Sequence, residues 1–329
     1  MNKKRWIALI VVVSLFIVSI GVQLNTSLVR MSQNDLFSMD TPTYQEEIIE
    51  DGDWEERIAV LQLNGAIMED VVSPYFGQGY SHHRMLKTIE LAAEDDSIKA
   101  VLLQINSPGG AVGPTAEIHE SLLALQEEYD KPFYVTMGET AASGGYYAAA
   151  PADKIYATSS TITGSIGVIM ESMNYAGLAE KYGITFNTIK SGKHKDIMSP
   201  SREMTKEEKD ILQSMIDEMY DEFVQVIVDG RQMTEEKVRE IGDGRVYTGN
   251  QAKKVGLVDE IGTFNDALQD LRETYELENA QVIQYSQEAN MFSYFVMEAK
   301  NKLQQKDSEL AAVMQLIRQS DKPQAMYLY

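Results

Sequence analysis

A serine at the start of a run of small residues is the first side chain in this sequence with the setting of a nucleophile. Ser143 lies in the segment TAASGGYYAAA (residues 140–150), between an apolar stretch typical of a β-strand and a run that favours a short helix. A helix start offers free backbone N–H groups and the positive end of the helix dipole. A serine there can attack a carbonyl carbon while the next N–H groups hold the oxyanion. A serine that only caps the helix has the same local sequence, so Ser143 alone leaves both interpretations open.

Two consecutive glycines follow a predicted buried strand and could supply further oxyanion donors. The segment is Ser107-Pro108-Gly109-Gly110. Successive backbone N–H groups in such a turn can point to one position and form an anion-binding nest. An ordinary strand-to-helix turn has the same composition. The segment therefore supports the serine as a nucleophile without deciding the chemistry.

A serine nucleophile needs a base, and the sequence offers histidines and lysines for this role. No histidine forms a convincing Ser–His–Asp arrangement; the four are His82, His83, His119 and His194. A lysine can replace the histidine if its amine is neutral, a form that burial favours. One loop carries three candidates, which are Lys190, Lys193 and Lys195. The residues alone do not choose among them.

The composition excludes several classes of site. The chain has no cysteine, which rules out disulfides, thiolate metal sites and a cysteine nucleophile. Four histidines in 329 residues make a histidine-rich metal site hard to build. With 29 basic and 50 acidic residues the net charge is -21, which repels phosphate backbones, and no basic patch interrupts it. We therefore expect no metal, no cofactor and no nucleic-acid partner.

The N-terminus has the pattern of a membrane anchor. Lys3, Lys4 and Arg5 precede residues 6–24, a run without charged side chains that is just long enough to cross a bilayer as a helix. A cleaved signal peptide usually has a shorter apolar core, which favours a retained anchor over residues 1–25. The basic residues favour a cytoplasmic N-terminus. The rest of the chain then lies outside the cytoplasm, in a single-pass protein of the cell membrane.

Strand-like and helix-like segments alternate in the soluble part of the chain. Buried strands are predicted at 57–67, 99–106, 132–137, 154–157 and 184–190. Helices are predicted at 114–129, 142–150, 174–182 and 205–231. The last helix begins with a capping box of Thr205 and Glu208. This alternation is typical of an α/β fold with crossover connections and helices on both faces of the sheet.

Composition divides the rest of the chain into three regions. Residues 26–55 are polar and acidic, and we interpret them as a linker after the anchor. Residues 56–285 form one α/β domain, and residues 286–329 form a tail with a predicted helix. The tail ends in DKPQAMYLY. A free tail and a tail that docks on the protein or on a neighbour both fit this segment.

Five segments together indicate a family. They are VLLQINSPGGAV, TAASGGYYAAAPADKIYA, TGSIGVI, IKSGKHKDIMSP and GRVYTGNQAKKVGLVDEIG. In this order and spacing the chain resembles the signal peptide peptidase A (protease IV) family, in the short single-repeat form of Gram-positive bacteria. The resemblance covers roughly residues 56–275 and the N-terminal anchor.

The resemblance assigns roles to five residues. It implies that Ser143 is the nucleophile and that Lys195 is the general base. It implies that the backbone N–H groups of Gly110 and Gly144 form the oxyanion hole. Ser165 corresponds to the hydroxyl that orients the lysine amine.

The resemblance also implies a fold, an activity and an assembly. The implied fold is ClpP/crotonase-like, a twisted sheet of βαβ units with a helical C-terminal extension, preceded by one transmembrane helix. The implied activity is that of a membrane-anchored serine endopeptidase that degrades remnant signal peptides after their release by signal peptidase. Neither a metal nor a cofactor takes part. The protein is expected to form a homo-oligomeric ring, an octamer, in which each Ser–Lys pair is completed across a subunit contact.

Three other interpretations stay open at this point. A crotonase-like acyl-CoA enzyme would share the fold and the glycines, but this acidic chain has no clear set of basic residues for the CoA phosphates. A catalytically inactive membrane scaffold would not need Ser143 or Lys195. A histidine-dependent protease of the ClpP type would use His119 as its base, or His194, which departs from the family motif.

Overall fold

The structure is a computed structural model that describes residues 44–69, 80–287 and 325–328. The predicted anchor at 1–25 and the predicted helix of the C-terminal tail lie outside these ranges. Within them, no helix is both long enough and apolar enough to cross a bilayer.

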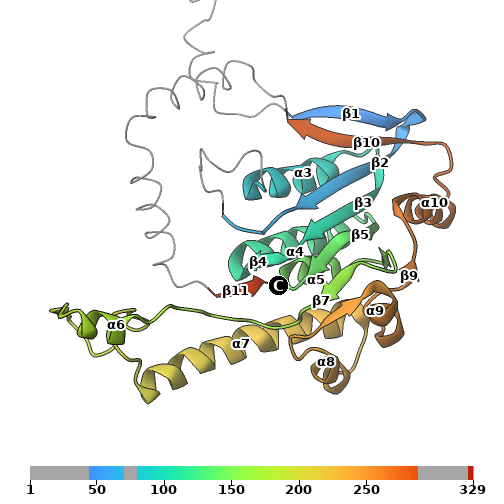
Figure 1. The fold of residues 1–329 in the computed structure, drawn as a ribbon. Helices are drawn as coiled ribbons and strands as arrows, with labels where there is room; N and C mark the ends of the chain where they lie inside the picture. Colours follow the sequence, from blue (N-terminus) through green and yellow to red (C-terminus); the bar gives the residue numbers. More distant parts are fainter. Residues whose placement is uncertain (1–43, 70–79, 288–324, 329) are drawn as a thin grey trace, which may run out of the picture. The chain divides into compact units, whose positions relative to one another are not determined.

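A mainly parallel sheet, nine-stranded within the described residues, forms the centre of the fold (Figure 1). Its order is β1 (Tyr44–Glu50), β10 (Ala280–Gln287), β2 (Asp53–Asn64), β3 (Ile98–Ser107), β5 (Phe133–Ala142), β6 (Lys154–Ala157) and β9 (Glu260–Ile261). From β10 to β9 each strand is parallel to its neighbour. The end of β5 also pairs in parallel with β7 (Ile162–Gly164), which pairs antiparallel with β8 (Val246–Thr248).

Helices connect most of the strands. They are α3 (His82–Glu94), α4 (Val112–Glu127), α5 (Gly144–Ala149), α6 (Ala176–Lys181), α7 (Lys206–Arg231), α8 (Glu235–Ile241), α9 (Gly249–Val255) and α10 (Phe264–Thr274). From β2 to β6 a helix follows each long strand of the sheet, as the alternating pattern predicts. A crossover of this kind brings the next strand back parallel to the first.

Side chains on the two faces of the sheet enter two different cores. Along β2, Leu61 and Leu63 pack in the larger core with side chains of α3, α4, α5 and α7. Ile58 and Val60 point to the opposite face and pack with side chains of α10. Successive strand residues alternate between faces, so one strand serves both cores. Helices therefore cover both faces, and the predicted α/β architecture is confirmed.

The long helix forms as predicted. The Thr205 Oγ1 accepts a hydrogen bond from the Glu208 N–H at 3.2 Å, and the Glu208 carboxylate accepts one from the Thr205 N–H at 2.9 Å. This is the predicted capping box. Phe223 and Ile227 are buried in the domain core, whereas Met215, two turns earlier, is exposed. Only the second half of α7 thus belongs to the core.

Two predicted segments differ from the structure. Residues 184–190 are not a strand: all of them are exposed, and they pair with no described strand. Their β-branched side chains have strand propensity, but a strand is stable only beside a partner. The predicted linker 26–55 also reaches into the sheet, because Tyr44–Glu50 pairs with β10 as β1 and β2 begins at Asp53.

Candidate active site

Ser143 lies at the sharp turn between β5 and α5. Its backbone has φ 54° and ψ -119°, a conformation that few non-glycine residues adopt. Its N–H donates to the Gly164 carbonyl at 2.7 Å. The side chain is fully buried, and its Oγ makes no hydrogen bond to any described residue, so it does not cap the helix. A strained backbone with an unpaired buried hydroxyl is more typical of a functional serine than of a structural one.

The two glycines predicted to form the oxyanion hole lie close together beside this serine. Gly110 is in β4 (Gly109–Ala111), and Gly144 is the first residue of α5. A Cβ atom built on Gly144 would lie 3.2 Å from the Gly110 nitrogen. One built on Gly109 would lie 2.7 Å from the Gly144 nitrogen and 3.0 Å from the Ser143 Cβ. The close packing of these backbones brings two candidate N–H donors to Ser143, as an oxyanion hole needs.

The register of the sheet places Ser165 next to Ser143. Ala142 pairs with Gly164 in parallel register, so the next residue of each strand leaves the sheet at the same edge. Ser165 also has a positive φ, 50°, and its N–H donates to the Arg245 carbonyl at 2.8 Å. The structure thus brings four of the five predicted site residues together.

The last described residues of the chain pair with β4, the strand that contains Gly110. The strand β11 (Met326–Leu328) pairs antiparallel with β4, and Tyr327 lies opposite Gly110. On the other side of β11, Met326 exchanges two backbone hydrogen bonds with Ile169, of 3.0 and 3.1 Å. Residues 326–328 are therefore docked on the domain. They lie in extended form in the space between β4 and Ile169, which we call the groove.

An aromatic pocket holds the Tyr327 side chain. Its ring stacks on Tyr147 with centroids 5.2 Å apart and packs against Phe223 at 4.8 Å. The Tyr327 hydroxyl donates to the Met219 carbonyl at 3.2 Å. The side chain is fully buried. The pocket therefore accepts one large apolar side chain from an extended segment that lies on β4.

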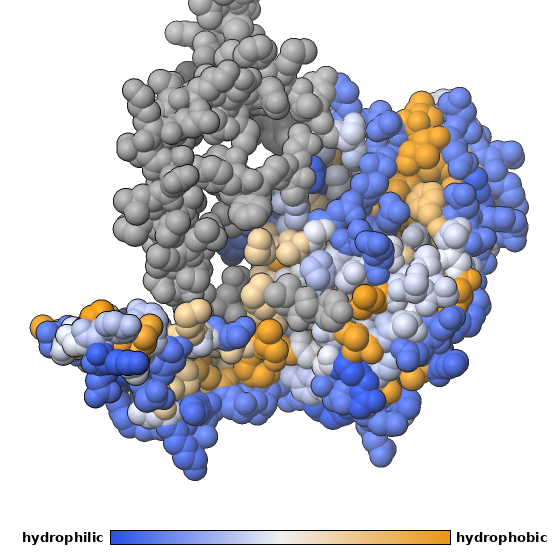
Figure 2. Space-filling model, in the orientation of Figure 1, coloured by the Kyte–Doolittle hydropathy of each residue, from blue (hydrophilic) through white to orange (hydrophobic). Residues whose placement is uncertain are grey.

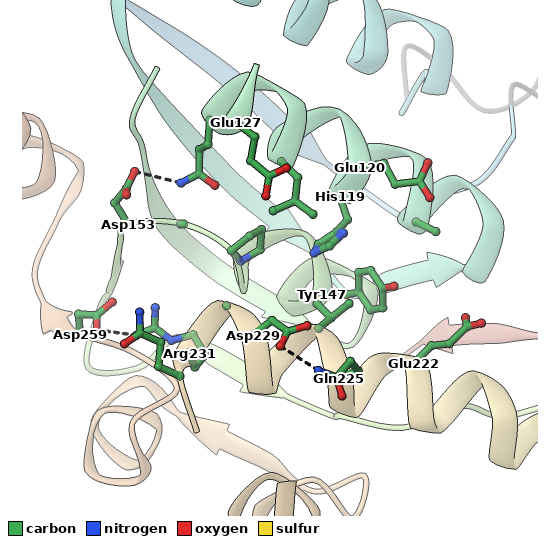
Figure 3. Close-up of a pocket in the computed structure, with 18 residues that line it drawn as sticks. His119, Glu120, Glu127, Tyr147, Asp153, Glu222, Gln225, Asp229, Arg231 and Asp259 are labelled. Atoms are coloured by element: carbon green, nitrogen blue, oxygen red, sulfur yellow. Dashed lines mark hydrogen bonds and ion pairs between the residues drawn. The ribbon is translucent and has the colours of Figure 1, made fainter. Parts of the chain in front are cut away.

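His119 lies in an acidic cleft between α4 and α7, which Tyr147 of the aromatic pocket also lines (Figure 3). Its ring meets Tyr147 edge-on with centroids 5.1 Å apart. Burial lowers the pKa of His119 to about 4, and the Asp229 carboxylate opposes this shift. No described side chain, His119 included, hydrogen-bonds to the Ser143 Oγ. In the described part of the chain, no group of three or more acidic and histidine side chains could hold a metal ion.

The segment between α6 and the start of α7, which carries Lys195, lies away from β4, α5 and β7 (Figure 1). Lys195 is exposed on the loop between α6 and α7. This loop contacts the first turn of α7, where the His194 Nε2 lies 3.3 Å from the Glu207 carboxylate. Phe223, in the aromatic pocket, lies four to five turns farther along the helix, about 24 Å at 1.5 Å per residue. Within one chain the structure does not bring Lys195 to Ser143.

Lys195 also differs from the other lysines of its loop. Lys190 forms an ion pair with Asp196, and Lys193 forms one with Glu207. Within the described ranges, Lys195 has no carboxylate partner. Its amine is the one in this loop that is free to meet another surface.

Comparison with known proteins identifies the family. The profile of Peptidase family S49 matches residues 126–278. A protein of Enterococcus faecium, named provisionally as signal peptide peptidase SppA, is 39% identical over 345 residues, which cover 100% of this chain and 99% of its own. The chain belongs to peptidase family S49. It is thus a member of a family of serine peptidases, as the sequence motifs predict.

Two further proteins are similar to this S49 peptidase. One, from Methanocaldococcus jannaschii and named provisionally as a protease, is 46% identical over 197 residues, 60% of this chain and 63% of its own. The other is a solved structure of a ClpP1 mutant from Listeria monocytogenes. It superposes with a TM-score of 0.41 and 18% identity over 64% of this chain and 94% of its own.

Sequence patterns do not single out the residues that shape the groove of this S49 peptidase. Tyr147 has a weak signal, as one of two adjacent tyrosines in a short helix whose other residues are glycines and alanines. Phe223 belongs to an apolar helical stripe and looks like an ordinary core residue. Ile169 borders the groove and Tyr327 fills it only through contacts between segments far apart in the sequence.

Proposed function

We propose that this S49 peptidase is a membrane-anchored serine endopeptidase that degrades remnant signal peptides, with Ser143 as nucleophile and Lys195 as general base. The position of β11 carries the proposal, because an extended peptide segment pairs with β4 directly beside Ser143. Addition of a strand to an exposed edge binds peptides largely through their main chains, so their sequences can vary. The aromatic pocket adds a preference for a large apolar side chain, which suits the apolar core of a signal peptide.

Ser143 and Lys195 divide the chemistry in this proposal. The neutral Lys195 amine takes the hydroxyl proton of Ser143 while Oγ attacks the carbonyl carbon of the peptide. The N–H groups of Gly110 and Gly144 donate to the oxyanion; loss of one such donor raises a barrier by about 2.7–4 kcal/mol. Lys195 then gives the proton to the leaving amine, and water hydrolyses the acyl-enzyme. The hydroxyl of Ser165 orients the lysine amine.

A second copy of the chain supplies Lys195 in this proposal. The segment that carries the lysine (residues 173–205, here called the arm) exposes several large apolar side chains (Figure 2). They include Met173, Leu178, Tyr182, Ile184, Phe186 and Ile189. Exposed apolar patches of this kind mark contacts between proteins. A closed ring, such as the predicted octamer, would let each arm complete the neighbouring site.

The free amine of Lys195 favours it as the base over its neighbours. The amines of Lys190 and Lys193 are engaged by the carboxylates of Asp196 and Glu207. Lys195 has no such partner within its own described chain. Its entry into a neighbour's apolar groove would further favour the neutral form.

The apolar N-terminal run supports a location at the cell membrane. Residues 6–24 are long enough to span a bilayer, and the basic residues before them favour a cytoplasmic N-terminus. The catalytic domain then lies on the extracytoplasmic side. An anchor would hold the groove near peptides that themselves lie in the membrane.

Matched variants of the lysine loop test the proposed function. Full-length protein in detergent is assayed on a synthetic signal peptide, with the oligomeric state of each variant measured in parallel. Ser143→Ala and Lys195→Ala should each lose activity by about three orders of magnitude or more. Lys193→Ala, which removes a paired lysine two residues away, should stay within about tenfold of wild type. An assembled, fully active Lys195→Ala variant would show that the base is another residue.

A further inference from the structure

Arg202 holds two carboxylates at the base of the Lys195 loop. Its Nε and Nη2 donate to the two Asp196 oxygens at 2.9 and 2.7 Å. Its Nη1 and Nη2 donate to the two Glu208 oxygens at 2.8 and 2.5 Å. Asp196 directly follows Lys195 in the chain. One guanidinium thus forms bidentate pairs with both carboxylates, the strongest geometry for such bonds.

The same contacts join the loop to a regular element. Glu208 lies in the first turn of α7, is 2% exposed, and is also part of the capping box with Thr205. Arg202 Nη2 donates in addition to the backbone carbonyl of Asp196 at 3.0 Å. Both the side chain and the backbone of Asp196 are therefore fixed relative to the start of α7. The position of the preceding residue, Lys195, is fixed with them.

Several other polar and charged side chains around the loop are also paired. Besides the two Arg202 pairs, the contacts are Lys190 with Asp196, Lys193 with Glu207, and His194 with Glu207 and, at 3.8 Å, with Glu208. Arg202 further donates to the Glu203 carbonyl at 3.0 Å. Every carboxylate in these contacts is taken by a cation other than Lys195.

We infer that Arg202 is a positioning residue, which binds the Asp196 and Glu208 carboxylates so that the Lys195 amine is presented in a fixed place without an acidic partner. The inference rests on the proposed pairing of Lys195 with Ser143. It gives a reason for the two Arg202 pairs: they keep the Lys195 amine available by binding the Asp196 and Glu208 carboxylates.

The physical consequence concerns the charge state of the lysine. A carboxylate within about 4–6 Å stabilises an ammonium ion and raises its pKa. Hydrogen bonds from Arg202, followed by those from Lys190, hold the pKa of Asp196 well below its usual range. Without Arg202, the Asp196 carboxylate keeps only its pair with Lys190 and is no longer held on both oxygens, so it can turn toward Lys195. The fraction of neutral lysine would then fall at any pH below its pKa.

The test compares the pH dependence of kcat/KM in full-length assembled protein. Activity should rise with pH as the lysine loses its proton, and Arg202→Gln should move this rise upward by about one pH unit. Arg202→Lys, which keeps one charge but loses the bidentate geometry, should move it less. Arg239→Gln is the matched control, because Arg239 also bridges two carboxylates, Asp221 and Glu235, at 2.7 and 2.8 Å.

A double variant separates this role from a purely structural one. In Arg202→Gln with Asp196→Asn, the Asp196 carboxylate is also absent. The rise of kcat/KM with pH should therefore return toward its wild-type position. A structural role alone would lower activity or stability at every pH without moving the rise. An unmoved rise in Arg202→Gln, with Lys195→Ala inactive, would overturn the inference and leave the Ser143–Lys195 pair standing.

Labelling of the amine gives a readout that does not depend on activity. In a Ser143→Ala background, the rate of Lys195 acetylation by acetic anhydride is followed against pH by peptide mass spectrometry. The titration should shift to higher pH when Arg202 is replaced by Gln, or by Lys if the Gln variant does not assemble. Identical titrations with and without the Arg202 guanidinium would contradict the inference.

Discussion

Ser143 and Ser165 share a positive φ angle, which sequence motifs do not reveal. Both have φ near 50°, in a region that favours glycine, and both follow paired residues at the end of the sheet. Strain of this kind persists only where the surrounding structure enforces it. Here two hydrogen bonds enforce it, from the Ser143 N–H to Gly164 and from the Ser165 N–H to Arg245.

At the same scale, His119 should make the folded protein sensitive to acid. Burial lowers its pKa to about 4, whereas an unfolded chain has a value near 6.5. The unfolded state therefore binds the proton more readily, so stability is full above about pH 6.5 and falls as the pH drops toward 4. By pH 4.5 this group alone should cost about 2.5 kcal/mol.

Urea unfolding at pH 7 and pH 4.5 measures this effect. His119→Leu removes the titrating group from between α4 and α7, so the variant should lose about 2.5 kcal/mol less than wild type between the two pH values. The comparison of differences cancels the contribution of the other titrating groups. Equal losses in both proteins would mean that burial of His119 does not disfavour its charged form.

At the scale of elements, β11 occupies the groove that a substrate would need. Tyr327→Ala should weaken its docking, because the ring loses its stacking on Tyr147 and its contact with Phe223. An added peptide would then compete more easily, and its KM should fall by about tenfold. Tyr327→Phe keeps the ring and loses only the hydroxyl bond to Met219, so its KM should stay close to wild type. Equal KM values in all three proteins would show that β11 does not block the groove.

Much of the element structure follows from local sequence. The strand at 154–157 and the capped helix α7 form where the sequence predicts them, because apolar burial and the capping box are local signals. Residues 184–190 have the same strand-like composition but no partner, so composition alone misleads there. The tail ends in apolar residues, but its pairing with β4 is a nonlocal contact that no local pattern contains.

The candidate site can be predicted only in part from the sequence, because it too depends on nonlocal contacts. Adjacent strand ends of a parallel sheet bring Ser143 and Ser165 together, and the glycine turn after β3 adds Gly110. The family motif suggests which lysine is the base, but it cannot show where that lysine lies. The ion pairs of Lys190 and Lys193, which leave Lys195 apart, become visible only in three dimensions.

At the scale of the whole molecule, the described chain contains a groove beside Ser143 and an arm that carries Lys195, and the two do not meet. The first half of α7 and the arm expose apolar side chains such as Met215, Tyr182 and Ile189, which a single copy leaves in water. A ring of copies would cover these side chains and would bring each lysine to a neighbouring serine. Catalysis would then depend on assembly.

Complementation between two inactive variants tests this account most directly. Ser143→Ala and Lys195→Ala proteins are dissociated, mixed in equal amounts and reassembled, with wild type treated in the same way. If a neighbouring copy supplies the lysine, some sites combine an intact serine from one variant with an intact lysine from the other. Random mixing in a ring should restore about a quarter of wild-type activity. A mixture that reassembles and stays inactive, while the treated wild type recovers, would contradict a site shared between copies.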